Sequence, residues 1–177
     1  MAETPRERYR TQVRAEIKQH AWEQIANAGV SALSLNAIAK QMGLSGPALY
    51  RYFAGRDELI TELIRDAYRS LADTVRAAAG ADLIALAGVI RDWARADPQR
   101  YFLIYGTPVP GYHAPADTTV ISDEIMAVLL DASGTLPRVL SFWTRLQGVL
   151  SLELAGHFAG MAFDPALLLA DELTDLS

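Results

Sequence analysis

Apolar residues recur along this chain every three or four positions, the spacing that places them on one face of an α-helix. A first stripe runs in steps of four residues from Val13 to Ile25, and Gly29 follows it, as a glycine does where a helix ends. The pattern predicts a helix over residues 8–28. No strand-like alternation, internal repeat or low-complexity segment competes with this helical pattern.

Two short helices separated by a glycine are predicted next. Ser34 is placed to cap the first of them, whose inner face lies within residues 35–42, and Gly43 ends it. Ser45 is placed to cap the second, over residues 46–53. The two helices and the turn between them are therefore candidates for a compact helical motif.

The remainder of the chain continues the helical pattern. A long fourth helix, with two acidic residues in its first turn, should run from Arg56 to about Ala79, before Gly80. Further helices are predicted over residues 82–96, 98–105, 117–132, 137–160 and 165–173. Three prolines and two glycines make residues 106–116 a loop. With about nine helices and no strand, the predicted fold class is all-α.

Composition is ordinary for a globular protein, and we expect a cytoplasmic location. Its 177 residues are enough for one or two small domains with a hydrophobic core, and 51% of them are apolar. The absence of cysteine excludes disulfides and thiolate metal sites and fits a reducing compartment. No uninterrupted apolar run reaches the roughly 18 residues of a membrane helix. The polar start, residues 1–10, has no apolar run behind it of the kind that a secretory signal carries.

Charge is distributed unevenly along the chain. Up to Arg56 there are eight Lys and Arg against four Asp and Glu, a net charge of +4, and the rest has eight against seventeen, a net charge of −9. A basic head on an acidic body is expected when only one end of a protein meets phosphate, with chance variation in surface charge as the alternative. Arg6, Arg8 and Arg10 fit either a minor-groove arm or a merely soluble, disordered terminus.

Residues 35–53 have the spacing of a helix-turn-helix. The small Ala39 allows two helices to cross closely, Gly43 falls where the turn needs a positive φ angle, and Leu49 closes the core between the helices. In this motif the second helix lies in the major groove of DNA. Ordinary core packing of two short helices is the alternative that spacing alone leaves open.

The segment LNAIAKQMGLSGPALYRYFAGRDELI, residues 35–60, resembles the DNA-binding signature of the TetR family of bacterial regulators. The shared features are an Ile-Ala pair, a Gly-hydrophobic turn, a Ser-x-Gly/Pro-x-Leu-Tyr recognition helix and a following Phe. The chain departs from the family at Tyr52, where His is more common, and at Arg56, where Lys is more common. The resemblance implies a helix-turn-helix DNA-binding domain in residues 1–56 and a helical ligand-binding and dimerisation domain in residues 57–177.

The recognition helix should separate buried side chains from exposed ones, with Leu49 and Phe53 facing inward. The residues left for DNA are Ser45, Gly46, Pro47, Ala48, Tyr50, Arg51 and Tyr52. Arg51 is the candidate for a base contact, since Arg pairs bidentately with guanine, while the small residues let the backbone approach thymine methyl groups. A solvated surface charge is the alternative for Arg51.

Phosphate contacts are expected to position the domain on the duplex. Tyr50 and Tyr52 are assigned to phosphate because family members use aromatic residues there, and Arg56 opens a helix whose N-terminus attracts phosphate. Ser34 and Lys40 are the candidates from the preceding helix. Half-buried packing for Tyr50 and a solvated surface charge for Lys40 are the alternatives.

The C-terminal half resembles a TetR subgroup marked by a Trp-x-x-x-His-Gly segment. Residues 143–148 read WTRLQG, so Gln147 replaces the histidine, keeping a hydrogen-bonding group and removing a titratable one. The resemblance implies a pocket for a small-molecule effector, with apolar walls and a few polar groups. The candidate lining residues are Trp93, Tyr101, Tyr105, Tyr112, His113, Phe142, Trp143 and Gln147. Ordinary core packing is the alternative for the aromatic members.

The predicted helix over residues 137–160 is apolar almost all round and should be buried on more than one side. Packing against its copy in a second subunit, together with a neighbouring helix, would explain this pattern, and packing within one body is the alternative. A dimer would present two recognition helices about 34–36 Å apart, or a multiple of that, to a near-palindromic duplex operator. The sequence itself does not separate a repressor from an activator, but the resemblance to the TetR family implies a repressor. We expect a small molecule to release it from DNA.

Other classes of protein fit the sequence less well. The histidines are scattered, and Glu153 with His157 alone does not make a metal site. The chain has no Gly-rich phosphate loop, nucleophile elbow or paired-His motif, so we predict neither an enzyme nor a cofactor. A helical protein–protein module would need neither the charge split nor the small exposed residues of the recognition helix.

Overall fold

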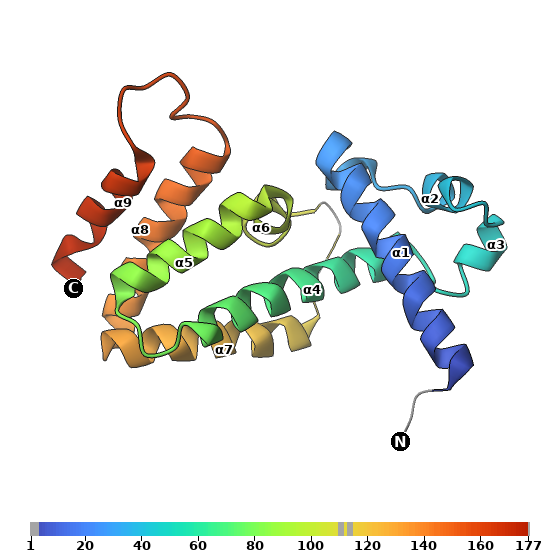
Figure 1. Ribbon diagram of the computed structural model, residues 1–177, viewed down its shortest axis with the longest axis horizontal. Coiled ribbons are helices and arrows are strands. Elements are labelled where there is room, and N and C mark those ends of the chain that lie inside the picture. The colour runs from blue at the N-terminus through green and yellow to red at the C-terminus, as the bar shows by residue number, and fades with distance from the viewer. Residues whose placement is uncertain (1–3, 110–111, 113–114, 177) are drawn as a thin grey trace. The chain divides into compact units, whose positions relative to one another are not determined.

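The computed structural model of this chain describes residues 4–109, 112 and 115–176. Within these residues the regular structure is entirely helical, with nine α-helices, two short 3-10 helices and no strand (Figure 1). The predicted all-α class is confirmed. The described residues divide into two compact units: the first holds those up to Arg65 with the described part of 107–114, and the second holds the others.

The first unit contains the helices that the sequence assigned to the helix-turn-helix region. Its elements are α1 (Pro5–Ala28), η1 (Val30–Ala32), α2 (Leu35–Gln41), α3 (Gly46–Leu49) and the first part of α4 (Arg56–Ala77). The predicted stripe from Val13 to Ile25 is buried along α1, as are Ile38 on α2 and Leu49 on α3. Because α2 and α3 are too short to be stable alone, burial of these faces holds them in place.

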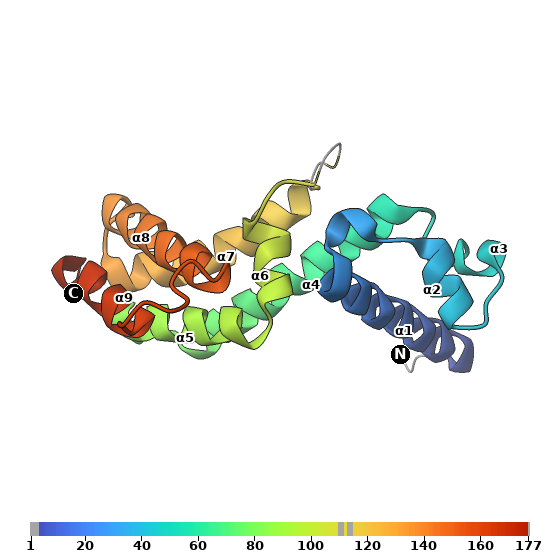
Figure 2. The same ribbon diagram turned by 90° about the horizontal axis from the view of Figure 1, so that it is seen from above.

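The second unit is a helical bundle around one core. Its elements are the rest of α4, α5 (Leu83–Ala96), α6 (Pro98–Tyr105), α7 (Ala116–Ser133), α8 (Leu136–Leu154), α9 (Pro165–Leu173) and η2 (Thr174–Leu176). Helix α8 packs against α5, α7 and α9 (Figures 1 and 2). Tyr101, Phe142 and Leu146 are buried at the centre of this core.

No single helix in the described ranges is long and apolar enough to span a membrane. Only α7 and α8 taken together reach the length and composition required, and they are bent by 112° relative to each other.

Helix α1 begins at Pro5, earlier than predicted. Thr4 Oγ1 accepts a hydrogen bond from the Glu7 N–H at 3.3 Å, and the Glu7 carboxylate accepts one from the Thr4 N–H at 2.7 Å. This capping box satisfies N–H groups that the first turn of a helix leaves free. The arginines within residues 6–10 are therefore helical, so the expectation of a disordered terminus was wrong, while the minor-groove arm stays a prediction.

Helix α3 is shorter than predicted, because it ends at Leu49 and a tighter turn continues to Phe53. The N–H groups of Arg51 and Tyr52 bond the carbonyls three residues before them, at 3.3 and 2.8 Å. Such bonds are typical of the 3-10 turn that closes many helices. The backbone over residues 46–53 keeps a helical path, but only its first turn is α-helical.

Helix α8 ends at Leu154, so the predicted helix over residues 137–160 ran too far. Gly156 adopts a φ of +78°, and the N–H groups of Gly156 and His157 return to carbonyls inside the helix, at 3.0 Å each. These two bonds form a Schellman motif, which ends the helix. The apolar pattern continues past the glycine as far as Phe158, and it is this continuation that misled the prediction.

Candidate nucleic-acid interface

The turn between α2 and α3 depends on Gly43. Its φ is +65°, a left-handed conformation that costs a residue with a side chain roughly 1–2 kcal/mol. Its N–H bonds the Lys40 carbonyl at 3.3 Å, and the next N–H, of Leu44, bonds the Ala39 carbonyl at 2.8 Å. These bonds end α2 in a Schellman motif and lead the chain into Ser45, the cap of α3.

Two buried side chains anchor α3 from beneath. Leu49 is 1% exposed and Phe53 is fully buried, whereas Tyr50 is 48% exposed and Arg51 is exposed. This separation is the one that the sequence predicted for a recognition helix. The outward side chains therefore remain available to a partner.

Ser34 and Ser45 cap α2 and α3 in the same way. Ser34 Oγ accepts a hydrogen bond from the Ala37 N–H, and Ser45 Oγ accepts one from the Ala48 N–H, each at 3.3 Å. A hydroxyl that accepts a backbone N–H keeps its own hydrogen to donate. Each cap can therefore hold its helix and donate to a phosphate at the same time.

The other predicted DNA contacts lie in different surroundings. Lys40 and Pro47 are exposed, while Gly46, Ala48 and Tyr52 are half-buried. Arg56 Nη2 donates to the Val30 carbonyl at 2.8 Å, so this guanidinium braces the start of α4 against η1. Arg56 is thus less free to reach a phosphate than its position in the sequence suggested.

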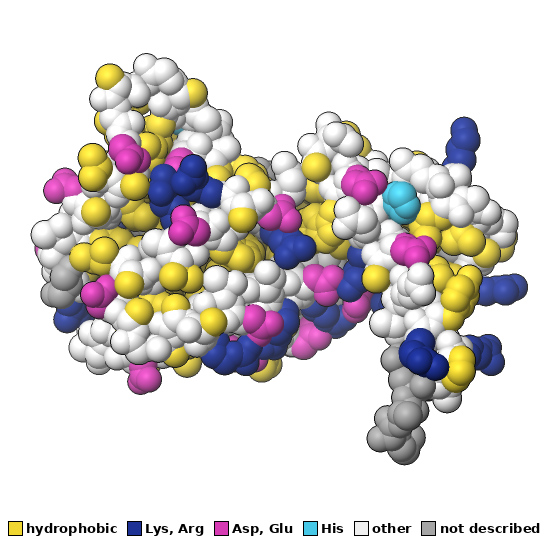
Figure 3. Space-filling model, viewed as in Figure 1, with side chains coloured by type: hydrophobic (Ala, Val, Ile, Leu, Met, Phe, Trp, Pro, Cys, Tyr) yellow, Lys and Arg dark blue, Asp and Glu magenta, His cyan; other side chains and the backbone are white. Residues whose placement is uncertain are grey.

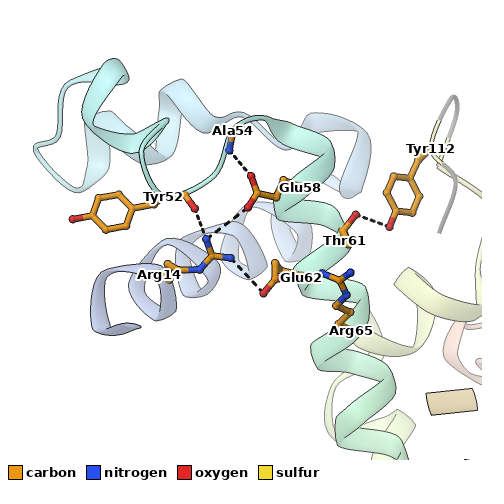
Figure 4. Close-up of polar contacts among 8 residues, drawn as sticks. All are labelled: Arg14, Tyr52, Ala54, Glu58, Thr61, Glu62, Arg65 and Tyr112. Atoms are coloured by element: carbon orange, nitrogen blue, oxygen red, sulfur yellow. Dashed lines mark hydrogen bonds and ion pairs between the residues drawn. The ribbon is translucent and has the colours of Figure 1, made fainter. Parts of the chain in front are cut away.

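Arg14 of α1 ties the end of the α3 turn to α4 (Figure 4). Its guanidinium donates to the Tyr52 carbonyl and lies 4.1 Å from the centre of the Phe53 ring. The same group pairs with the carboxylate of Glu58 at 3.7 Å and with that of Glu62 at 3.4 Å. One side chain thereby connects three elements of the first unit.

Glu58 adds a second contact at this junction, because its carboxylate accepts a hydrogen bond from the Ala54 N–H at 2.5 Å (Figure 4). Arg14 was missed from the sequence because Tyr52 lies 38 residues away along the chain. The available signal was a pair of acidic residues, Glu58 and Glu62, one turn apart on the predicted fourth helix. An acidic pair of this kind needs a cationic partner when it faces inward.

Four of the predicted pocket residues come together in the second unit. The ring centres of Tyr101 and Tyr105 are 5.6 Å apart, and those of Tyr105 and Trp143 are 5.5 Å apart. The Tyr101 hydroxyl donates to Gln147 Oε1 at 2.7 Å and lies 2.8 Å from Ser151 Oγ. Gln147 Nε2 is buried with no hydrogen-bond partner among the described residues, so this cluster holds an unused donor.

The hydroxyls of this cluster are neutral at physiological pH. Burial raises the pKa of Tyr101 above its ordinary value. Burial also raises the pKa of Tyr105, and the nearby hydroxyls of Tyr68 and Tyr101 raise it further. Since Gln147 does not titrate, a molecule bound here would meet neutral donors and acceptors rather than a charge.

The other predicted pocket residues are spread over both units. Phe142 is fully buried in the core of the second unit, and Trp93 packs against that core with Nε1 donating to Ser70 Oγ at 3.1 Å. A hollow of about 150 Å³ between α5 and α9 is lined by none of the predicted residues.

Tyr112 belongs to the first unit, where its hydroxyl lies 2.9 Å from the Thr61 hydroxyl of α4 (Figure 4). Tyr112 therefore belongs to a different unit from the cluster at Tyr101 and Tyr105. His113 was also predicted to line the pocket, and it lies outside the described residues.

A capped helix, a glycine turn and a second helix anchored from beneath with its polar side exposed define a helix-turn-helix protein. The chain matches the bacterial regulatory proteins of the tetR family over residues 17–63 and the tetracyclin repressor-like C-terminal domain over residues 83–176. The chain belongs to the TetR family of transcriptional regulators. The predicted family is confirmed, as is the prediction of a regulator rather than an enzyme.

Known proteins support this assignment. The HTH-type transcriptional regulator Rv1816 of Mycobacterium tuberculosis is 42% identical over 132 residues, which cover 70% of this chain and 56% of that relative. The chain thus spans little more than half the length of that relative. The crystal structure of SCO4313, a protein classed as regulatory, is 66% identical over 98% of both chains with a TM-score of 0.92. A Rhodococcus sp. RHA1 protein of unknown function, 20% identical over 92% of both chains, shares the fold with a TM-score of 0.77. Membership of the Trp-His-Gly subgroup stays a prediction.

Proposed function

We propose that this chain is a repressor that binds a near-palindromic DNA operator as a dimer and is released by a small molecule. The observation that carries the proposal is α3, where Leu49 and Phe53 are buried while Tyr50 and Arg51 are exposed. Residues 1–56 act as the DNA-binding domain, and residues 57–177 bind the effector and form the dimer. The protein works in the bacterial cytoplasm and associates with the nucleoid when its operator is occupied.

The exposed side of α8 supports the dimer. Val139, Phe142 and Leu146 are buried in the core, but Leu140 and Leu152 on the same helix are 49% and 44% exposed. Leu136 at the start of the helix is exposed as well. Single exposed apolar residues are ordinary, whereas several on one helix are typical of an interface. Packing of α8 and a neighbouring helix against their copies would cover them.

The cluster at Tyr101, Tyr105, Trp143 and Gln147 supports the effector site. Aromatic walls with a few polar groups are typical of small-molecule pockets, and the free Gln147 Nε2 selects a ligand that carries a hydrogen-bond acceptor. Because no titratable group with a pKa near neutrality lines the cluster among the residues that the structure describes, the response to the effector should be the same at pH 6 and at pH 8.

Two routes connect the effector domain to the DNA-binding domain in this proposal. Helix α4 begins in the first unit and ends in the second. The segment over residues 107–114 follows α6 of the second unit, and its Tyr112 bonds Thr61 of α4. An effector that binds one arrangement of α4 more tightly than another shifts the population and thereby the affinity for DNA.

The proposal is tested by selecting bound sequences from random duplex DNA, with and without a library of metabolites. The full chain should enrich a near-palindromic sequence, and at least one metabolite pool should reduce its recovery. The Arg51→Ala variant, run in parallel, should enrich a consensus with one position less defined in each half-site. Failure of the wild-type chain to enrich any sequence over the starting pool would contradict the proposal.

A further inference from the structure

A groove in the first unit lies beside the recognition helix and extends beyond the helix-turn-helix. Its volume is about 320 Å³. It is lined by Arg6, Tyr9 and Arg10 of α1, by Leu44 of the turn, and by Ala48, Arg51 and Tyr52 at and after α3. The α1 residues lie outside the helix-turn-helix, and Arg6 and Arg10 are two of the arginines that the sequence offered as a minor-groove arm. Lys and Arg side chains gather on the surface around the start of α1 (Figure 3).

The α1 side of this groove is held in a fixed helical conformation. The capping box of Thr4 and Glu7 starts the helix at Pro5, so Arg6 and Arg10 lie one turn apart on the same face. Thermal fraying at a helix start is reduced by such a cap. The two guanidinium groups therefore project from a rigid wall rather than from a loose terminus.

Arg14 continues the same face of α1 one turn further on and holds the two walls of the groove together. It donates to the carbonyl of Tyr52, whose side chain lines the opposite wall. Arg14 is neutralised there by Glu58 and Glu62. Helix α1 thus presents three arginines in a row, and only the innermost has carboxylates beside it.

The groove is strongly cationic. Arg6, Arg10 and Arg51 line it, no acidic residue lines it, and no ion pair joins these arginines to an acidic residue in the described part of the chain. Guanidinium groups bind phosphate oxygens bidentately, and Tyr hydroxyls donate to phosphate as well. A ligand with closely spaced negative charges matches this surface better than an apolar or cationic one.

We propose that this groove binds the sugar-phosphate backbone of the operator, with Arg6 and Arg10 of α1 contacting backbone phosphates beside the bases that α3 reads. The inference rests on the proposed DNA-binding function and adds a contact surface outside the helix-turn-helix. Contacts to phosphate carry no sequence information, so this surface raises affinity for every duplex and fixes the register of α3. Arg51 lines the groove beside α3, so its side chain lies between the phosphates that α1 contacts and the bases that α3 reads.

Arg8 provides a matched control, because it lies between Arg6 and Arg10 in sequence, is exposed, and does not line the groove. The variants Arg6→Ala, Arg10→Ala, their double variant and Arg8→Ala are titrated with the selected operator and with a scrambled duplex at several salt concentrations. Each phosphate contact contributes about 0.9 to the slope of log K against log salt concentration. The slope should therefore flatten by about 1 for each groove arginine and by about 2 for the double variant.

Both duplexes should lose affinity by the same factor in the groove variants, and Arg8→Ala should change slope and affinity much less. Equal thermal unfolding midpoints for the four variants show that the helix start is intact, and Arg10→Lys should restore most of the slope. Groove variants that behave like Arg8→Ala would overturn the inference while leaving the proposed function in place. If the loss of affinity depends on the A·T content of the DNA beside the operator, Arg6 and Arg10 contact the minor groove rather than phosphate. That outcome would overturn the inference too. A wild-type chain that binds neither duplex would overturn the proposed function itself.

Discussion

At the scale of single residues, position decides the role of a cation more than charge does. The Arg14 side chain is 24% exposed and lies beside two carboxylates, so it stabilises the first unit and is not free to bind DNA. Arg51 and Lys40 are exposed, and neither has an ion pair in the described residues. Only cations of the second kind are available to DNA.

Replacing Arg51 by Ala should cost about 1–3 kcal/mol of affinity for the operator and relax specificity at one base pair of each half-site. The reason is the loss of a bidentate pair to guanine. Competition binding against operators altered at each position in turn measures both effects. Lys40→Ala is the comparison: it should weaken all sequences alike and flatten the salt slope by about 1. If Arg51→Ala ranks the operators as the wild-type chain does, Arg51 makes no base contact.

Replacing Arg14 by Met should lower the free energy of unfolding by about 1–3 kcal/mol, because it removes a charge-assisted hydrogen bond and takes the shared cation away from two carboxylates, of which Glu62 keeps only Arg65. Met keeps the apolar stem that packs near Phe53. Chemical denaturation measures the change. The exposed Arg8, replaced by Ala, should change stability by no more than about 0.5 kcal/mol. Equal denaturation midpoints for Arg14→Met and the wild-type chain would show that the junction does not stabilise the unit.

At the scale of elements, the turn of the helix-turn-helix rests on one backbone conformation. Gly43 has a φ of +65°, and a Cβ added there would meet nothing within 4 Å. Gly43→Ala should therefore destabilise the chain by about 1–2 kcal/mol through backbone strain alone. Gly55→Ala is the control, because a Cβ there also meets nothing and its φ is not positive. The two thermal unfolding curves should separate; coincident curves would argue against the strained turn.

Helix α8 offers a test of the proposed dimer. Leu152→Arg should turn the dimer into a monomer of about 19.3 kDa, because it places a charge in an apolar interface. Tyr9→Arg on α1, where the side chain is 63% exposed and lies outside the proposed dimerisation domain, is the control and should leave the dimer intact. Sedimentation equilibrium measures both masses. Unchanged mass for Leu152→Arg would remove this side of α8 from the interface.

The elements also show how far the sequence leads. Long periodic stripes such as the one from Val13 to Ile25 predict a helix and its buried face, because both depend on local spacing. Helix ends were less predictable. The Schellman motif at Gly156 depends on a backbone conformation that the surrounding apolar residues do not predict. The tight turn after Leu49 depends on hydrogen-bond geometry, which the apolar pattern does not predict either.

At the scale of the whole molecule, the uneven charge and the family signature were enough to predict a regulator with a DNA-binding head. The parts of the site that join distant segments were not predictable. Arg14 meets Tyr52, Glu58 and Glu62 only because three helices pack together, and Arg6 and Arg10 face the groove only because α1 is capped at Thr4. The local pattern of apolar and polar residues predicts neither the contacts of Arg14 nor the position of Arg6 and Arg10 at the groove.

The account as a whole depends on α3 reading bases in the major groove, and a double-mutant cycle between protein and DNA tests this most directly. The guanine assigned to Arg51 in the selected operator is replaced by 7-deazaguanine, which lacks the N7 acceptor. The substitution should weaken binding of the wild-type chain by about tenfold and leave binding of Arg51→Ala unchanged, because that variant has already lost the contact. Equal losses for both proteins at every guanine of the operator would contradict the account.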